Sequence, residues 1–176
     1  ASLVFTDSNW ASAQTVTVSG VNDDIDDGNQ AYNIVLAAAT SSDSNYNGVN
    51  PDDVSVSNTD NNTAGFTVSA ISGATTEAAG TATFTVVLTS EPTSDVTIGV
   101  SSSDTGEGTV NTASLVFTDS NWASAQTVTV TGVNDYIDDG DQAYSIVLAA
   151  ATSSDSNYNG VNPNDVSVIN TDNETK

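Results

Sequence analysis

Apolar and polar residues alternate with a period of two along most of the chain, which is the spacing of a β-strand with one buried face. In the segment Thr81–Leu88, for example, Ala82, Phe84, Val86 and Leu88 share one face, and threonines occupy the other. The period of 3.6 residues that an amphipathic helix needs is absent. The pattern therefore predicts an all-β protein.

Seven segments of this kind follow one another, and turn signals such as Glu91–Pro92 and Asp139–Gly140 separate them. Seven short strands with such spacing are typical of an immunoglobulin-like seven-stranded β-sandwich. We expect the strands at residues 66–71, 81–88, 96–101, 114–117, 126–131, 143–149 and 165–169.

The chain repeats itself. The segment that starts at Ala1 recurs at Ala113, 112 residues further on, and the two copies differ at eight of 64 aligned positions. Copies this similar indicate a tandem repeat. We expect a partial repeat, the C-terminal half of a sandwich domain, over residues 1–61, and a complete sandwich domain over residues 62–176. The partial repeat should carry counterparts of the last four strands only.

The composition argues against several classes of function. The formal net charge is −22 and Lys176 is the one basic residue, so the chain lacks the cations that bind nucleic acid or an anionic membrane. The chain has no histidine, the usual general base, and no cysteine. Serine and threonine hydroxyls therefore have no base to activate them, and we do not expect an enzyme. No segment reaches the roughly 18 apolar residues of a membrane span.

The loop that follows residues 126–131 is strongly acidic. It holds four carboxylates within seven residues, those of Asp135, Asp138, Asp139 and Asp141. Ca²⁺ takes six to eight oxygen ligands, and clustered aspartates supply them. Without a cation, two carboxylates about 5 Å apart repel each other by roughly 3 kcal/mol at an effective dielectric constant near 20. The loop indicates a calcium site, and a solvated acidic loop is the alternative.

The complete repeat resembles the Calx-beta domains. The resemblance rests on Glu77 in TTEAAGTATFTVVL, Asp104 in SSSDTGEGT, the pair Asn134–Asp135, and Asp172 in INTDNE. It implies a seven-stranded sandwich that binds Ca²⁺ at one end, beside the next domain. The ligands that it implies are Glu77, Asp104, Asn134, Asp135, Asp138, Asp139 and Asp172, with Asn22, Asp23, Asp26, Asp27 and Asp60 as counterparts in the partial repeat.

Two departures from the family pattern lower the charge of this site. The family has an aspartate where this chain has Asn134, and it has several aspartates where this chain has one, Asp172. Fewer ions or weaker binding follow from a smaller ligand charge.

A second acidic loop, around Asp155, Asn157, Asn159 and Gly160, fits the first half of an EF-hand calcium loop. The fit then fails, because the twelfth position is Val166 and the flanking segments are predicted strands. Two interpretations remain open, a metal site and a polar hairpin loop that turns at Asn159–Gly160. We favour the hairpin loop.

These observations and the resemblance imply a calcium-binding structural repeat that rigidifies and extends a large extracellular protein, such as a bacterial cell-surface adhesin used in attachment and biofilm. Its partners would be neighbouring repeats of the same chain. The alternative is a calcium-dependent binding module, either a carbohydrate-binding domain or a calcium sensor. The partial repeat has an apolar face but no strands to cover it, so it should form a homodimer through residues 1–61. Such a dimer would be a product of truncation of the repeat.

Overall fold

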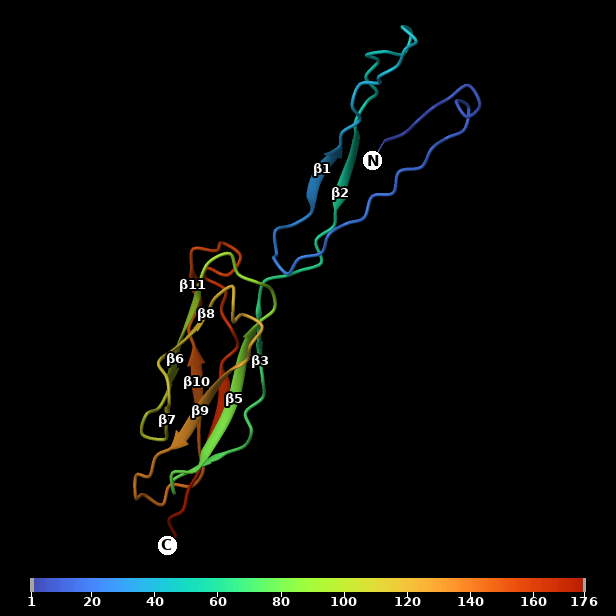
Figure 1. Ribbon diagram of the computed structural model, residues 1–176. Helices are drawn as coiled ribbons and strands as arrows, with labels where there is room; N and C mark the ends of the chain where they lie inside the picture. Colours follow the sequence, from blue (N-terminus) through green and yellow to red (C-terminus); the bar gives the residue numbers. More distant parts are fainter. Residues whose placement is uncertain (1, 176) are drawn as a thin grey trace. The chain divides into compact units, whose positions relative to one another are not determined.

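The computed structural model of the chain describes residues 2–175, which fall into two compact units. Unit 1 comprises Ala1–Asp23 and Asn29–Thr59, and unit 2 comprises Asp24–Gly28 and Asp60–Lys176. Each regular element of the described range is a β-strand, as Figure 1 shows, so the all-β prediction is confirmed. Within residues 2–175, no helix has the length and apolarity of a membrane span.

Unit 1 contains one antiparallel pair of strands, β1 (Gln30–Ile34) and β2 (Val54–Asn58), in which Tyr32 lies opposite Val56. We expected two further strands here, at residues 2–5 and 14–19, and this was wrong, because neither segment forms a strand. Their counterparts in unit 2 are strands that pair with residues 81–88 and 96–99, and the partial repeat has no counterpart of those residues.

One layer of unit 2 is an antiparallel sheet of four strands. Its order is β3 (Phe66–Val68), β5 (Thr81–Leu88), β9 (Gln126–Gly132) and β7 (Gly108–Val110). The β5–β9 pair sets the register of the layer, because Ala82, Phe84 and Val86 lie opposite Val130, Val128 and Gln126.

The other layer is a sheet of six strands. Along it run β11 (Thr152–Ser153), β6 (Val96–Ser102), β10 (Gln142–Leu148), β12 (Val166–Thr171) and β4 (Thr75–Thr76), and β8 (Ser114–Phe117) also pairs with β6. All pairs are antiparallel except β12 with β4, which are parallel. In Figure 1, β5, β6, β9 and β10 all run between the same two ends of unit 2.

The core lies between the two layers, as the period of two predicted. Alternate residues of β5 and β9 are buried, and Phe84 is only 1% exposed. Ile98, Phe117 and Ile146 of the opposite layer are fully buried against them. This burial of apolar area is the main force that holds the sandwich together.

The first strand differs from the prediction of one strand over residues 66–71. Within the predicted range only β3 (Phe66–Val68) is a strand, and it joins the four-stranded layer. After Ser72–Gly73 the chain forms β4, outside the predicted range, which joins the six-stranded layer. Two more short strands, β7 and β11, extend the predicted seven. The split matters for function, since it brings the residue after β4 to the end of β12.

Candidate metal centre

Six carboxylates gather at one end of unit 2, which we call the acidic end. They form two groups of three, and within each group one oxygen from every residue lies within 4.8 Å of the others. The first group is Glu77, Asp172 and Glu174, and the second is Glu107, Asp135 and Asp139. All six residues lie in chain segments that flank the same ends of the strands: after β4, before β7, between β9 and β10, and after β12. Figure 1 shows the end of β9 at this end of unit 2.

Strand pairing places Glu77 beside Asp172. Because β4 runs parallel to β12, with Thr76 opposite Thr171, the residues that follow the two strands are neighbours. The Glu77 amide donates to the Thr171 carbonyl over 3.1 Å and continues this pairing. Glu77 is only 4% exposed, and its Oε2 accepts a hydrogen bond from the Asn173 amide. A buried carboxylate without a cation is costly, so this position needs a compensating partner.

Asp172 ties the loop after β9 to the end of β12. Its Oδ1 accepts the Glu174 amide over 2.8 Å, and its Oδ2 accepts the Gly140 amide over 2.7 Å. These amides, that of Glu174 first, hold the pKa of Asp172 below its usual range, because they stabilise the charged form. The side chain is thus ionised and fixed in place.

Glu174 sits against two other carboxylates. The neighbouring Glu77 carboxylate, then burial, then Asp172 raise the pKa of Glu174 to about 7. The Oε2 atom of Glu174 is buried, and no N–H or O–H group of the described residues donates to it. Carboxylates this close share a hydrogen bond only if one is protonated, so the group holds either a proton or a cation.

The second group forms around Glu107, the residue directly before β7. Its Oε2 accepts a hydrogen bond from Asn170 Nδ2 over 3.2 Å, and the Val133 amide donates to its carbonyl oxygen. Burial raises the pKa of Glu107, the bond from Asn170 opposes this, and the charges of Asp139 and Asp135 raise it further. The second group therefore also disfavours a full set of negative charges.

Gly132 allows the strands to converge here. A Cβ atom at this position would collide with the Thr76 carbonyl oxygen and with Asn170 Oδ1. Asn170 is itself buried and also donates to the Val133 carbonyl. The close approach of β9 to β4 and β12 brings the two carboxylate groups to the same end.

The structure brings together only some of the ligands predicted for the complete repeat. Glu77, Asp135, Asp139 and Asp172 enter the two groups, whereas Asp104, Asn134 and Asp138 do not. Asp104 Oδ1 accepts the Gly106 amide, Asn134 Oδ1 accepts the Tyr136 amide, and Asp138 is exposed.

Two members of the groups, Glu107 and Glu174, were missed by the sequence reasoning. Glu107 lies three residues after Asp104 in the same loop, and Glu174 lies two residues after Asp172. Acidic residues next to a predicted ligand are the signal that could have found them.

The partial repeat supplies fewer carboxylates. Asp60, the counterpart of Asp172, accepts the Gly28 and Asn62 amides, each over 2.7 Å, and these bonds, that of Asn62 first, lower its pKa. Asp26 accepts the Ala64 amide. Asp27 lies with Asp26 and Asp60 in unit 2, and Asn22 and Asp23 belong to unit 1. Asn62 stands where the second copy has Glu174, and within residues 2–175 no group of three acidic residues forms from this copy.

The loop around Asp155 has an internal role. Asp155 is 6% exposed; its Oδ2 accepts the Thr93 amide and its Oδ1 accepts the Asn157 amide. Burial acts to raise the pKa of Asp155, but these amides outweigh it and the pKa is lowered. Both carboxylate oxygens are engaged by backbone, which supports the interpretation as a polar hairpin loop.

The donor set of the acidic end fits Ca²⁺ on chemical grounds. Calcium binds carboxylate oxygens at about 2.3–2.6 Å, so two ligands of one ion lie no more than about 5 Å apart. The spacing within each group meets this limit. Carbonyl oxygens and water would complete six to eight ligands.

Comparison with known proteins gives one clear family match. The sequence model described as "Calx-beta domain" matches residues 1–62 and residues 57–174. No curated protein matches the chain significantly. Among solved structures, domains 4 and 5 of the S-layer protein SbsC are similar at 17% identity with a TM-score of 0.36, over 83% of this chain and 70% of that one.

Proposed function

The chain belongs to the Calx-beta domain family, whose members generally bind calcium, and we propose that its intact repeat is a calcium-binding structural module. The observation that carries the proposal is the acidic end itself. Six carboxylates meet there in two groups, two of them with a pKa raised by burial or by other carboxylates, in a chain whose one basic residue is Lys176. A divalent cation is the partner that relieves this repulsion.

Each group would hold an ion through its own side chains. Glu77, Asp172 and Glu174 would bind one, and Glu107, Asp135 and Asp139 the other. The bound cation supplies the positive charge that the protein lacks. The protein supplies preorganisation, since amides from Gly140 and Asn173 already fix two of the carboxylates.

We further propose that the module serves as a spacer in an extracellular array. Near-identical copies, eight differences in 64 positions, suit a role that sets length better than a role in selective binding. Extracellular calcium modules bind with a Kd of about 10⁻⁴–10⁻³ M, which suits calcium concentrations outside the cell. An adhesin-type surface protein is the parent that we propose for it.

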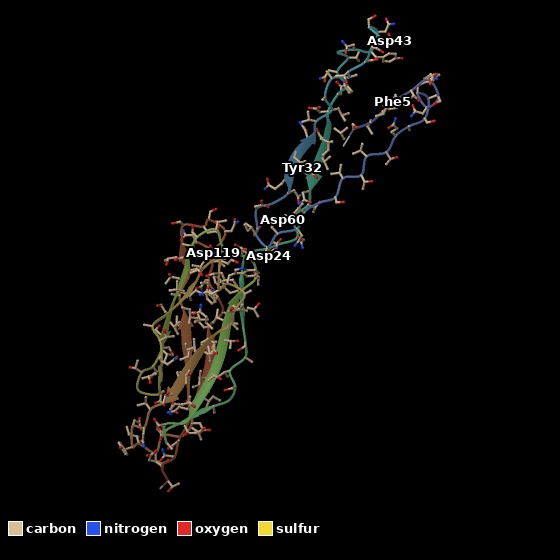
Figure 2. The ribbon with its side chains drawn as sticks, in the orientation of Figure 1. Phe5, Asp24, Tyr32, Asp43, Asp60 and Asp119 are labelled. Atoms are coloured by element: carbon tan, nitrogen blue, oxygen red, sulfur yellow. The ribbon has the colours of Figure 1, made fainter. Side chains whose placement is uncertain are left out.

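Titration calorimetry of the full chain with Ca²⁺ tests the proposal. The native chain should bind with a Kd of about 10⁻⁴–10⁻³ M. The double variant Glu77→Gln/Glu107→Gln, which removes one charge from each group, should lose most of this binding. Asp119→Asn is the matched control, because Asp119 lies at the other end of unit 2 in Figure 2. Equal binding by the double variant and the native chain would refute the proposal.

A further inference from the structure

A short segment of the partial repeat is part of unit 2. This segment, Asp24–Gly28, is the counterpart of Tyr136–Gly140 in the complete repeat. It belongs to the same loop that carries acidic-end ligands in the second copy. In the first copy this loop therefore contacts the complete repeat that follows it.

The segment is held mainly by backbone. The Glu91 amide donates to the Asp24 carbonyl over 2.7 Å, and Ile25 forms an isolated parallel β-bridge with Glu91. The Asp26 carbonyl accepts a hydrogen bond from Asn157 Nδ2, and the Asp26 carboxylate accepts the Ala64 amide. Backbone pairing of this kind makes little demand on side-chain identity, so the counterpart loop can repeat it.

Glu91 and Asn157 lie at the end of unit 2 opposite the acidic end. Glu91 follows β5, whereas Glu77 precedes it, and Asn157 follows β10, whereas Asp139 precedes it. One repeat thus has the loop at one end and the residues that receive it at the other. Two different surfaces at opposite ends produce an open, head-to-tail assembly.

Asn157 and its counterpart Asn45 differ in the acceptor of their side-chain amide, and only Asn157 donates to the docked segment. In unit 1 the side-chain amide of Asn45 donates to Asp43 within its own loop, over 3.0 Å. In unit 2 the backbone amide of Asn157 still donates to Asp155, but its side-chain amide donates to the Asp26 carbonyl. The same residue thus has a second hydrogen-bonding state that engages the incoming segment.

The loop of the second copy is exposed. Tyr136 is 82% exposed and Ile137 is 57% exposed, whereas Ile25, the counterpart of Ile137, is half-buried. We propose that the loop Tyr136–Gly140 is a docking surface for the Glu91 and Asn157 end of a further copy of this repeat. The inference rests on the proposed role as a repeat in an array and not on the proposed calcium site, although Asp139 of this loop belongs to that site.

Disulfide trapping tests this inference, because the native chain has no cysteine. In the native-length chain, the pair Ile25→Cys/Glu91→Cys should form a disulfide readily. This result would verify that Asp24–Gly28 lies against Glu91, the contact on which the inference is based. The chain is then lengthened by a second copy of residues 65–176, with Ile137→Cys in the native part and Glu91→Cys in the added copy. This pair should crosslink at least about tenfold faster than a control pair that places Thr105→Cys in the added copy.

Asn157→Asp in the added copy should slow the crosslink, and Asn45→Asp, the same change where no loop docks, should not. Circular dichroism of each variant confirms that it is folded. Crosslinking at the rate of the Thr105 control, or no effect of Asn157→Asp, would overturn the proposal. The rates are measured in both calcium and EDTA, so failure of calcium binding in calorimetry is distinguishable from failure of docking.

Discussion

The backbone amide of Gly140 donates a hydrogen bond of 2.7 Å to the Asp172 carboxylate, and this bond closes the loop after β9 onto the end of β12. Gly140 has a φ of +78°, a region that favours glycine. The relationship recurs between Gly28 and Asp60, also at 2.7 Å with a φ of +72°. The loop is thus preorganised by residues that both copies share.

Asp172→Asn should weaken calcium binding by at least roughly tenfold, because it removes a charged ligand and disturbs the bond from Gly140. Asp119→Asn, which removes the same charge from the opposite end of unit 2, should leave the affinity unchanged. Titration calorimetry measures both. An Asp172→Asn chain that binds like the native one would exclude this residue as a ligand.

Calcium should stabilise the native chain against heat. An ion that binds only the folded state contributes about 2.7 kcal/mol at one hundred times its Kd, which raises Tm by several degrees. Differential scanning calorimetry in calcium and in EDTA gives the shift. The Glu77→Gln/Glu107→Gln chain should show a much smaller shift, and an equal Tm in both buffers for the native chain would contradict the prediction.

Without calcium, stability should fall as the pH rises from about 4.5 to about 7. The pKa of Glu174 is raised from 4.5 to about 7 in the folded state, so the folded state binds more protons than the unfolded state within this window. The raised pKa of Glu107 acts in the same direction. The lowered pKa of Asp172 acts below this window, where its stabilisation is lost as the pH falls through the folded value.

Urea unfolding in EDTA at several pH values between 4.5 and 7 measures this slope. Glu174→Gln should flatten it, and calcium should reverse it, because the bound ion favours the ionised carboxylates. A native chain whose stability in EDTA increases with pH across the window would show that the acidic end does not hold a shared proton.

Asp155→Ala should separate stability from calcium binding. The change removes the acceptor of two part-buried hydrogen bonds, those donated by the Thr93 and Asn157 amides, and each should cost about 0.5–1.5 kcal/mol of unfolding free energy. Calcium affinity should remain that of the native chain. Loss of calcium binding with unchanged stability would instead identify this loop as a metal site.

The sequence predicted which residues form the sandwich core, but not which segments find a neighbouring strand to pair with. Alternation correctly placed Phe84, Ile98 and Ile146 inside. It also predicted strands at residues 2–5 and 114–117, which differ in no residue, yet only the second segment is a strand. Phe117 is fully buried because β8 pairs with β6, whereas Phe5 is 55% exposed. Strand formation at this segment depends on tertiary pairing, which no local pattern contains.

The residues of the acidic end could also be predicted only in part from the sequence. The family pattern led to Asp104, whose carboxylate turns back to the Gly106 amide, whereas Glu107 three residues on joins Asp135 and Asp139. What selects Glu107 is its bond to Asn170, a residue of β12 that is 63 positions away in sequence. Contacts of this range follow from the packing of β7, β9 and β12 and could not be read from the loop alone.

The exposed face of unit 1 should drive self-association of the chain. Tyr32, Val16 and Val18 are 38–46% exposed, and their counterparts Tyr144, Val128 and Val130 are at most 5% exposed. The sequences around these positions are nearly identical, but in unit 2 the counterparts of Val16 and Val18 lie in β9 of the four-stranded layer and that of Tyr32 lies in β10 of the six-stranded layer. Unit 1 therefore exposes apolar positions that both layers bury in the complete repeat. Such faces are aggregation and association sites.

We expect two chains to pair through residues 1–61, most simply about a two-fold axis. Light scattering should give a dimer at micromolar concentration, and Val16→Thr/Val18→Thr/Tyr32→Ser should shift it to monomer. The matched control is Val116→Thr, an exposed valine of unit 2. Because these three side chains belong to unit 1, the triple variant should leave calcium binding by unit 2 unchanged, which verifies that unit 2 is folded. A native chain that stays monomeric at every concentration tested would show that unit 1 tolerates its open face.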